Sequence, residues 1–190
     1  MLDLMEKAIK ILKKGGVVIF PTDTAFGVGC RIDNSDAIER LFKIRNRPRI
    51  QPLPILVASC EQSLAYFVHP SDIVRHLMDT YWPGALTIVD YCKKNMVLSP
   101  IRAGAETVGI RFPNHSVAQM LIEGAGVPIV GPSANFHGKP TPFTFDSLDP
   151  NFIKLVDFVI PGECTSYNVS TVVDCTTDPY TIIRQGAIVL

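Results

Sequence analysis

The stretch VVIFPTDTAFGVG, residues 17–29, joins two apolar runs through a short polar turn. The first run, VVIF at 17–20, follows the glycine pair at 15–16, which ends a segment with apolar residues at helical spacing. Open α/β sheets bind ligands beyond the carboxyl ends of their strands, so Thr22, Asp23 and Thr24 are candidate ligand contacts. A hydrogen-bonded turn without any ligand would use the same residue types.

The rest of the chain continues the alternation of helices and strands. Ser35 and Ser71 are expected N-caps. Helices are expected at 36–44, 72–81, 116–126 and 146–154, and strands at 25–32, 53–59, 82–91, 106–112, 127–130, 155–161, 169–175 and 181–185. Early strands alternate with helices, whereas the late strands follow one another through loops. This order predicts an α/β fold with a mixed sheet.

Composition limits the class of protein. A length of 190 residues fits one domain, 1–190, and 18 basic side chains balance 18 acidic ones, which argues against a general polyanion binder. Five cysteines without a C-x-x-C pattern predict reduced thiols. The sequence shows neither a signal peptide nor an apolar run long enough to cross a bilayer, so we expect a soluble, cytoplasmic protein.

Several common signatures are missing from the sequence. The glycines at 15–16 are not followed by G-K-[ST], and GVG at 27–29 lacks the third glycine of a dinucleotide fingerprint. The four histidines show no metal-ligand spacing. We therefore expect no metal site built from protein side chains alone.

Basic residues gather locally in KIRNRPRIQP, residues 43–52. Lys43, Arg45, Arg47 and Arg49 alternate, and wherever the backbone is extended such side chains share a face. They repel one another unless an anion lies nearby, although a solvated helix end would also favour them. Arginines inside the apolar runs at 107–112 and 181–185 need partners, because a buried charge without one is costly.

The stretch GPSANFHGKPTP, residues 131–142, follows an expected strand and presents small polar groups. Ser133 lacks the G-x-S-x-G context, and no histidine and acid pair is organised to activate it as a nucleophile. Together with the arginines, Ser133 and Asn135 fit a phosphate-bearing ligand better.

Seven ordered motifs carry a resemblance to a known family. They are PTDTAFGVG, RNRPRIQPL, WPGALTIV, TVGIRFPNH, GPSANFHGKPTP, STVVD and IIRQGAI, within residues 15–188. The chain resembles the YrdC-like threonylcarbamoyl-AMP synthases. The resemblance implies a twisted mixed β-sheet flanked by helices around a positively charged central cavity. It also implies that L-threonine, bicarbonate and ATP give threonylcarbamoyl-AMP and pyrophosphate, for modification of a tRNA adenosine.

The resemblance also implies site residues, carried over position by position. The catalytic set would be Arg45, Arg47, Ser133 and Asn135. ATP would contact Arg47, Gln51, Thr107, Ser133, Thr141 and Arg184. Threonine would contact Thr24, Arg111, Gly131 and Ser170, and a guanidinium such as that of Arg111 suits a carboxylate. Mg²⁺ would arrive with ATP rather than occupy a dedicated protein site.

Three positions depart from the family pattern. Arg45 and Gln51 replace usual lysines, and Phe26 replaces a common tyrosine. If Arg45 contributes only charge, Arg45→Lys would preserve activity, which is the outcome that the sequence favours; if its guanidinium forks onto phosphate oxygens, lysine would weaken ATP binding. An RNA-binding module, or a paralogue that is not a synthase, stays an alternative. Since the sequence ends soon after the last motif, we expect it to release its adenylate to a separate tRNA-modifying complex.

Overall fold

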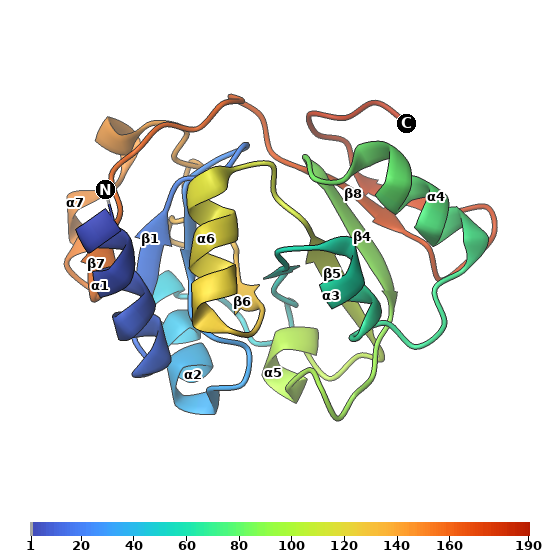
Figure 1. Cartoon of the computed structure of the whole chain (residues 1–190), viewed down its shortest axis with the longest axis horizontal. Coiled ribbons are helices and arrows are strands. Elements are labelled where there is room, and N and C mark those ends of the chain that lie inside the picture. The colour runs from blue at the N-terminus through green and yellow to red at the C-terminus, as the bar shows by residue number, and fades with distance from the viewer. Residues whose placement is uncertain (1) are drawn as a thin grey trace.

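The computed structural model describes residues 2–190, and its helices and strands are shown in Figure 1. Helix α1, Leu2–Lys13, packs beside helix α6, Ser116–Ala125, with both in front of strand β1 in that view. Glycine makes this close approach possible, because a Cβ at Gly124 would lie 2.2 Å from Ile9 Cδ1. Apolar residues of both helices form one buried cluster with those of β1.

Two hydrogen-bonded sheets make up the β structure. The smaller has the order β2-β1-β7, from Gly27–Gly29, Val18–Phe20 and Phe158–Val159. The larger has the order β6-β3-β5-β4-β8-β9, from Ile129–Val130, Ile55–Leu56, Thr107–Arg111, Leu86–Tyr91, Thr171–Asp174 and Thr181–Arg184. Both sheets combine parallel and antiparallel pairs, which confirms the predicted mixed arrangement.

The segment after β6 runs alongside β2 and joins the two sheets. Isolated bridges pair Gly27 with Ser133 and Arg31 with Ile129. The backbone N–H of Ala134 donates to the carbonyl of Phe26 over 2.8 Å. The two stretches singled out in the sequence, 17–29 and 131–142, are therefore neighbours in space.

The helix ends confirm most of the capping predictions. The hydroxyl of Ser71 accepts from the N–H of Val74 at the start of α4, Asp72–Tyr81, and Gly126 ends α6 with φ 79°. The prediction for Ser35 was wrong. Helix α2, Ser35–Arg45, begins at Ser35, and the side chain of Asn34 accepts from Ala37 N instead.

Shorter helical elements complete the fold. The sequence did not predict α3, Cys60–Leu64, or α5, Ser99–Arg102. The helix expected at 146–154 is divided into a 3₁₀ turn, Phe145–Ser147, and α7, Pro150–Ile153. The helices lie outside the sheets, as the predicted α/β fold requires (Figure 1).

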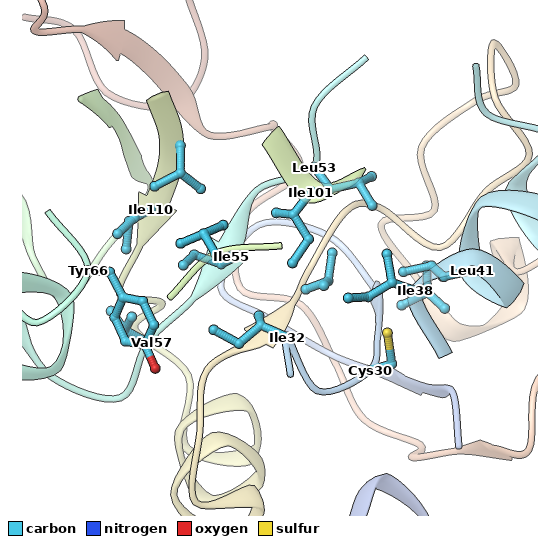
Figure 2. Close-up of a cluster of buried hydrophobic side chains, with 14 of the residues drawn as sticks. Cys30, Ile32, Ile38, Leu41, Leu53, Ile55, Val57, Tyr66, Ile101 and Ile110 are labelled. Carbon is cyan, nitrogen blue, oxygen red and sulfur yellow. The ribbon is translucent and has the colours of Figure 1, made fainter. Parts of the chain in front are cut away.

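The main core lies between the two sheets and the helices that cover them. Figure 2 shows Cys30, Ile32, Ile38 and Leu41 meeting Leu53, Ile55 and Ile110, so this core links the smaller sheet to the larger one. All five cysteines are free, and burial raises the pKa of the Cys30 thiol to about 12. Across residues 2–190, no helix has the length and apolar character needed to span a bilayer.

Candidate functional site

A cavity lies where the segment after β1, the end of α2 and the segment after β6 meet the larger sheet. Four arginines line it. The sequence-predicted residues in its wall are Thr22, Thr24, Arg45, Arg47, Arg111, Gly131, Ser133, Thr141, Ser170 and Arg184. The structure thus brings most of the predicted ATP and threonine contacts into one cavity.

Arg111 ends strand β5 and is held on three sides. Its Nε donates to the carbonyl of Gly84 over 3.0 Å, and its Nη1 donates to Thr24 Oγ1 over 2.7 Å. Its Nη2 forms an ion pair with Asp23, whose carboxylate does not line the cavity. Both side chains are buried. Because a guanidinium has five N–H donors, one on each Nη nitrogen stays available to a ligand.

The hydroxyls of Thr22 and Thr24 are ordered by the turn that holds them. Thr22 Oγ1 donates to the carbonyl of Ala25 over 2.7 Å and accepts from the backbone N–H groups of Thr24 and Ala25 over 3.1 and 3.2 Å, which uses its proton and both of its lone pairs. Thr24 Oγ1, 3.1 Å from Thr22 Oγ1, accepts from Arg111. One lone pair of Thr24 is left, which suits a ligand N–H such as that of an amino group.

Ser170, a predicted threonine contact, is hydrogen-bonded to Arg184, a predicted ATP contact. Arg184 donates through Nε and Nη2 to the carbonyl of Ser170, over 3.1 and 2.8 Å, and through Nη2 to its hydroxyl over 3.0 Å. The Ser170 hydroxyl is 2.9 Å from that of Thr87 on β4, another residue of the cavity wall. The predicted amino-acid and nucleotide contacts are therefore linked by direct hydrogen bonds.

Arg45, at the end of α2, lies against Asn135. Its Nε donates to the Asn135 carbonyl over 3.1 Å, and its Nη2 donates to Asn135 Oδ1 over 3.3 Å. Its Nη1 is buried and has no hydrogen-bond partner within the described residues. A buried cationic nitrogen without an acceptor is unfavourable, and Arg45 lines the cavity, so an anion bound there would offset the charge of this guanidinium.

Ser133 and Asn135 form one polar unit. Ser133 Oγ donates to Asn135 Oδ1 over 2.6 Å, and Asn135 Nδ2 donates to the carbonyl of Lys139 over 2.6 Å. Asn135 does not line the cavity, so it acts by holding Arg45 and Ser133. With its proton committed to an amide oxygen, Ser133 lacks the general base that a nucleophile requires.

Arg47 reaches the cavity from the segment after α2. It donates to the carbonyls of Gln51, over 3.3 Å, and Pro52, over 2.8 Å. The Gln51 side chain is outside the cavity wall and lies 3.5 Å from His137 Nε2. The backbone carbonyl of Gln51 holds Arg47, and the contact of Gln51 with ATP stays a prediction.

Thr107 is the other predicted ATP contact outside the cavity wall. It begins β5, where it pairs with Tyr91, whereas Arg111 ends the same strand. Four residues of extended strand separate them by about 13 Å. The structure does not bring Thr107 to the cavity, and its contact with ATP stays a prediction.

Burial affects the electrostatics of all four cavity arginines. Burial lowers the pKa of Arg45 to about 10, and the nearby charge of Arg47 is a second, smaller cause of this shift. Burial also lowers the pKa of Arg47 and of Arg184. It lowers the pKa of Arg111 as well, with Asp23 opposing this. An anion placed among these cations would offset the loss of hydration, so the cavity is suited to negatively charged ligands.

Sequence reasoning missed one residue that shapes the site, Thr87, and the role of another, Asp23. Asp23 was a candidate as part of the turn, but its pairing with Arg111 joins positions 88 apart in the chain. Thr87 stands in the apolar run LTIVDY and gives no local signal of a cavity position. The sequence indicated that Arg111 needs a partner, and this was the one available signal that an acidic residue such as Asp23 pairs with it.

Carboxylates are absent from the described cavity wall. Over residues 2–190, no cluster of three or more histidine, cysteine or acidic side chains could hold a metal ion. The wall offers guanidinium and hydroxyl groups, which match phosphate or carboxylate oxygens rather than a divalent cation.

Comparisons with known proteins show which family the chain matches. A family model named for Sua5, YciO and YrdC, with the description "Telomere recombination", matches residues 10–186. The chain is 34% identical over 183 residues to the threonylcarbamoyl-AMP synthase of Bacillus subtilis, covering 96% of this chain and 53% of the relative. It is 29% identical over 188 residues to the uncharacterized Escherichia coli protein YciO, covering 96% and 89%.

Solved structures agree with this assignment. The structure of Pyrococcus abyssi Sua5 complexed with L-threonine superposes with a TM-score of 0.91 at 33% identity, covering 96% of this chain and 54% of that one. The Escherichia coli YciO structure gives a TM-score of 0.85 at 28% identity, covering 98% and 90%. The chain spans about half the length of the Bacillus and Pyrococcus relatives. The chain belongs to the Sua5/YciO/YrdC family.

Proposed function

We propose that this protein is a threonylcarbamoyl-AMP synthase, which uses L-threonine, bicarbonate and ATP. One observation carries the proposal. A single cavity contains a cluster of three guanidinium groups, from Arg45, Arg47 and Arg184, and a further arginine, Arg111, with free donors beside the hydroxyl acceptor of Thr24. The first suits a phosphate and the second suits the carboxylate and amino groups of an amino acid.

The proposed reaction has two bond-forming steps. The threonine nitrogen bonds to the carbon of bicarbonate with loss of water, which gives a carbamate. A carbamate oxygen then attacks the α-phosphorus of ATP, and the bond to the departing pyrophosphate breaks. The nucleophile is already anionic, so no protein nucleophile is required.

Five residues of the cavity wall have roles at the phosphates and the nucleotide in this scheme. Arg45, Arg47 and Arg184 would neutralise the charge that builds on the phosphates, where fixed cations contribute most of the catalysis. Ser133 and Thr141 would position the nucleotide. Because the wall offers no carboxylate, Mg²⁺ would be bound by the ATP phosphates and would supply further charge neutralisation.

The product would be consumed by a separate reaction that transfers the threonylcarbamoyl group to a tRNA adenosine. We propose that a separate protein complex, rather than this protein, carries out this transfer to tRNA. Five unpaired thiols support a reducing compartment, and we propose the cytoplasm.

The identity of the product tests this function. ATP labelled at the α-phosphate is incubated with bicarbonate and either threonine or serine, and nucleotides are separated and identified by mass. We expect threonylcarbamoyl-AMP from threonine. Serine lacks one methyl group, so we expect it to be used about 10- to 200-fold less efficiently. An AMP-linked product of equal yield from both amino acids would contradict the assignment of a threonine site.

A further inference from the structure

Thr87 lines the cavity and was not among the predicted contacts. It lies on strand β4 of the larger sheet and is 4% exposed. Within the described part of the chain, the hydroxyl of Ser170, 2.9 Å away, is its one side-chain hydrogen-bond partner. A buried hydroxyl normally uses both its donor and its acceptor capacity, so Thr87 has hydrogen-bonding capacity left for a ligand.

The protons of this hydroxyl pair can be counted. Ser170 Oγ accepts an N–H from Arg184 Nη2 over 3.0 Å. Thr87 and Ser170 together have two hydroxyl protons, and their mutual bond uses one of them. Whichever residue donates to the other, one proton stays without an acceptor. The pair therefore offers one donor in either arrangement.

Strand register places this donor beside Arg111. Ile88 of β4 pairs with Ile110 of β5, so Thr87 and Arg111 are the next residues along the two strands. Both line the cavity, where Arg111 keeps one free N–H on each Nη nitrogen. Two guanidinium donors and one hydroxyl donor fit the lone pairs of a carboxylate.

We propose that Thr87 and Ser170 act as one shared hydrogen-bond donor to the carboxylate of the amino-acid substrate. This inference rests on the proposed function and adds Thr87 to its substrate contacts. Since either hydroxyl can provide the donor, each residue substitutes for the other when one is lost.

A double-mutant cycle tests the shared donor. Threonine affinity is measured by calorimetry for the unmodified protein, Thr87→Val, Ser170→Ala and the double variant. We expect about threefold weaker binding for each single variant, and about 30-fold or more for the double variant, because a hydrogen bond to a charged group contributes about 10- to 150-fold. Two independent contacts would instead multiply to about ninefold.

Thr87→Ser is a matched control because it keeps the hydroxyl at position 87. The variant with both Thr87→Ser and Ser170→Ala should therefore bind threonine as Ser170→Ala alone does. Arg184 retains its two bonds to the Ser170 carbonyl in these variants. ATP affinity should therefore stay within about twofold throughout.

The outcomes separate this inference from the proposed function. The shared donor would be overturned if the double variant bound threonine only as weakly as the product of the two single effects predicts. It would also be overturned if Thr87→Ser with Ser170→Ala bound threonine as weakly as the double variant does. The synthase assignment would stand in both cases. An unmodified protein that does not bind threonine would overturn both.

Discussion

Asp23 and Arg111 form an ion pair in which both side chains are almost fully buried, at 8% and 7% exposure. The pair connects the turn after β1 to the end of β5. Arg111 faces the cavity, whereas Asp23 is outside its wall. The position of Arg111 in the cavity wall therefore depends on an acid that does not itself line the cavity.

Asp23→Asn should destabilise the fold and weaken threonine binding. Removing one partner of a buried ion pair costs about 3–5 kcal/mol, because the other charge is left uncompensated. Urea denaturation measures the free energy of unfolding. Calorimetry on folded protein should show a larger loss for threonine than for ATP.

Asp33→Asn is the matched control for this change. Asp33 pairs with Arg31 at the surface, with side chains 48% and 22% exposed. Exposed pairs contribute about 0–1 kcal/mol, so the control should unfold nearly as the original protein does. Equal effects of the two substitutions would contradict the structural role of Asp23.

Arg47→Ala should lower turnover far more than stability. Arg47 reaches the cavity and is fixed by two backbone carbonyls, so its charge is preorganised for a phosphate. Loss of one preorganised electrostatic contact reduces turnover by about 100-fold or more. Initial rates of pyrophosphate release at saturating substrates measure this.

Arg49→Ala is the control from the same segment. Arg49 is 64% exposed, pairs with Glu39 and does not line the cavity. Its loss should leave turnover within about twofold. Full activity in Arg47→Ala, or an equal loss in Arg49→Ala, would argue against a specific phosphate contact.

Arg45→Lys tests whether the phosphate end needs a guanidinium. Charge alone predicts preserved activity, but Arg45 donates through Nε and Nη2 to Asn135 and also lines the cavity in which the ligand would bind. A single ammonium cannot serve both groups. We expect ATP affinity to fall at least about tenfold, as measured by calorimetry, with threonine affinity unchanged. Unchanged ATP affinity would show that only the charge matters.

Local signals in the sequence account for the parts of the fold that were predicted. Ser71 and Gly126 act on the helices next to them, so their caps follow from neighbouring residues. Asn34 and Ser35 are adjacent and both can cap a helix, which is why the boundary of α2 was misplaced by one residue. The five-residue helix α3 is too short to give a periodic pattern.

The site was predictable to the extent that its residues follow strand ends in recognisable motifs. Arg111 and Ser133 belong to such motifs and line the cavity together. Asp23 and Thr87 depend on partners that are more than 80 positions away in the sequence, Arg111 and Ser170. Tertiary pairing of this kind leaves no periodic or spacing signal, so the supporting contacts required the structure.

Pyrophosphate release from ATP tests the central claim most directly. The rate is measured with Mg²⁺, threonine and bicarbonate together, and again with threonine or bicarbonate omitted. We expect rapid release with both present and a fall of at least about tenfold when either is absent, since ATP cleavage requires the carbamate as nucleophile. Release at the same rate without threonine would contradict this claim.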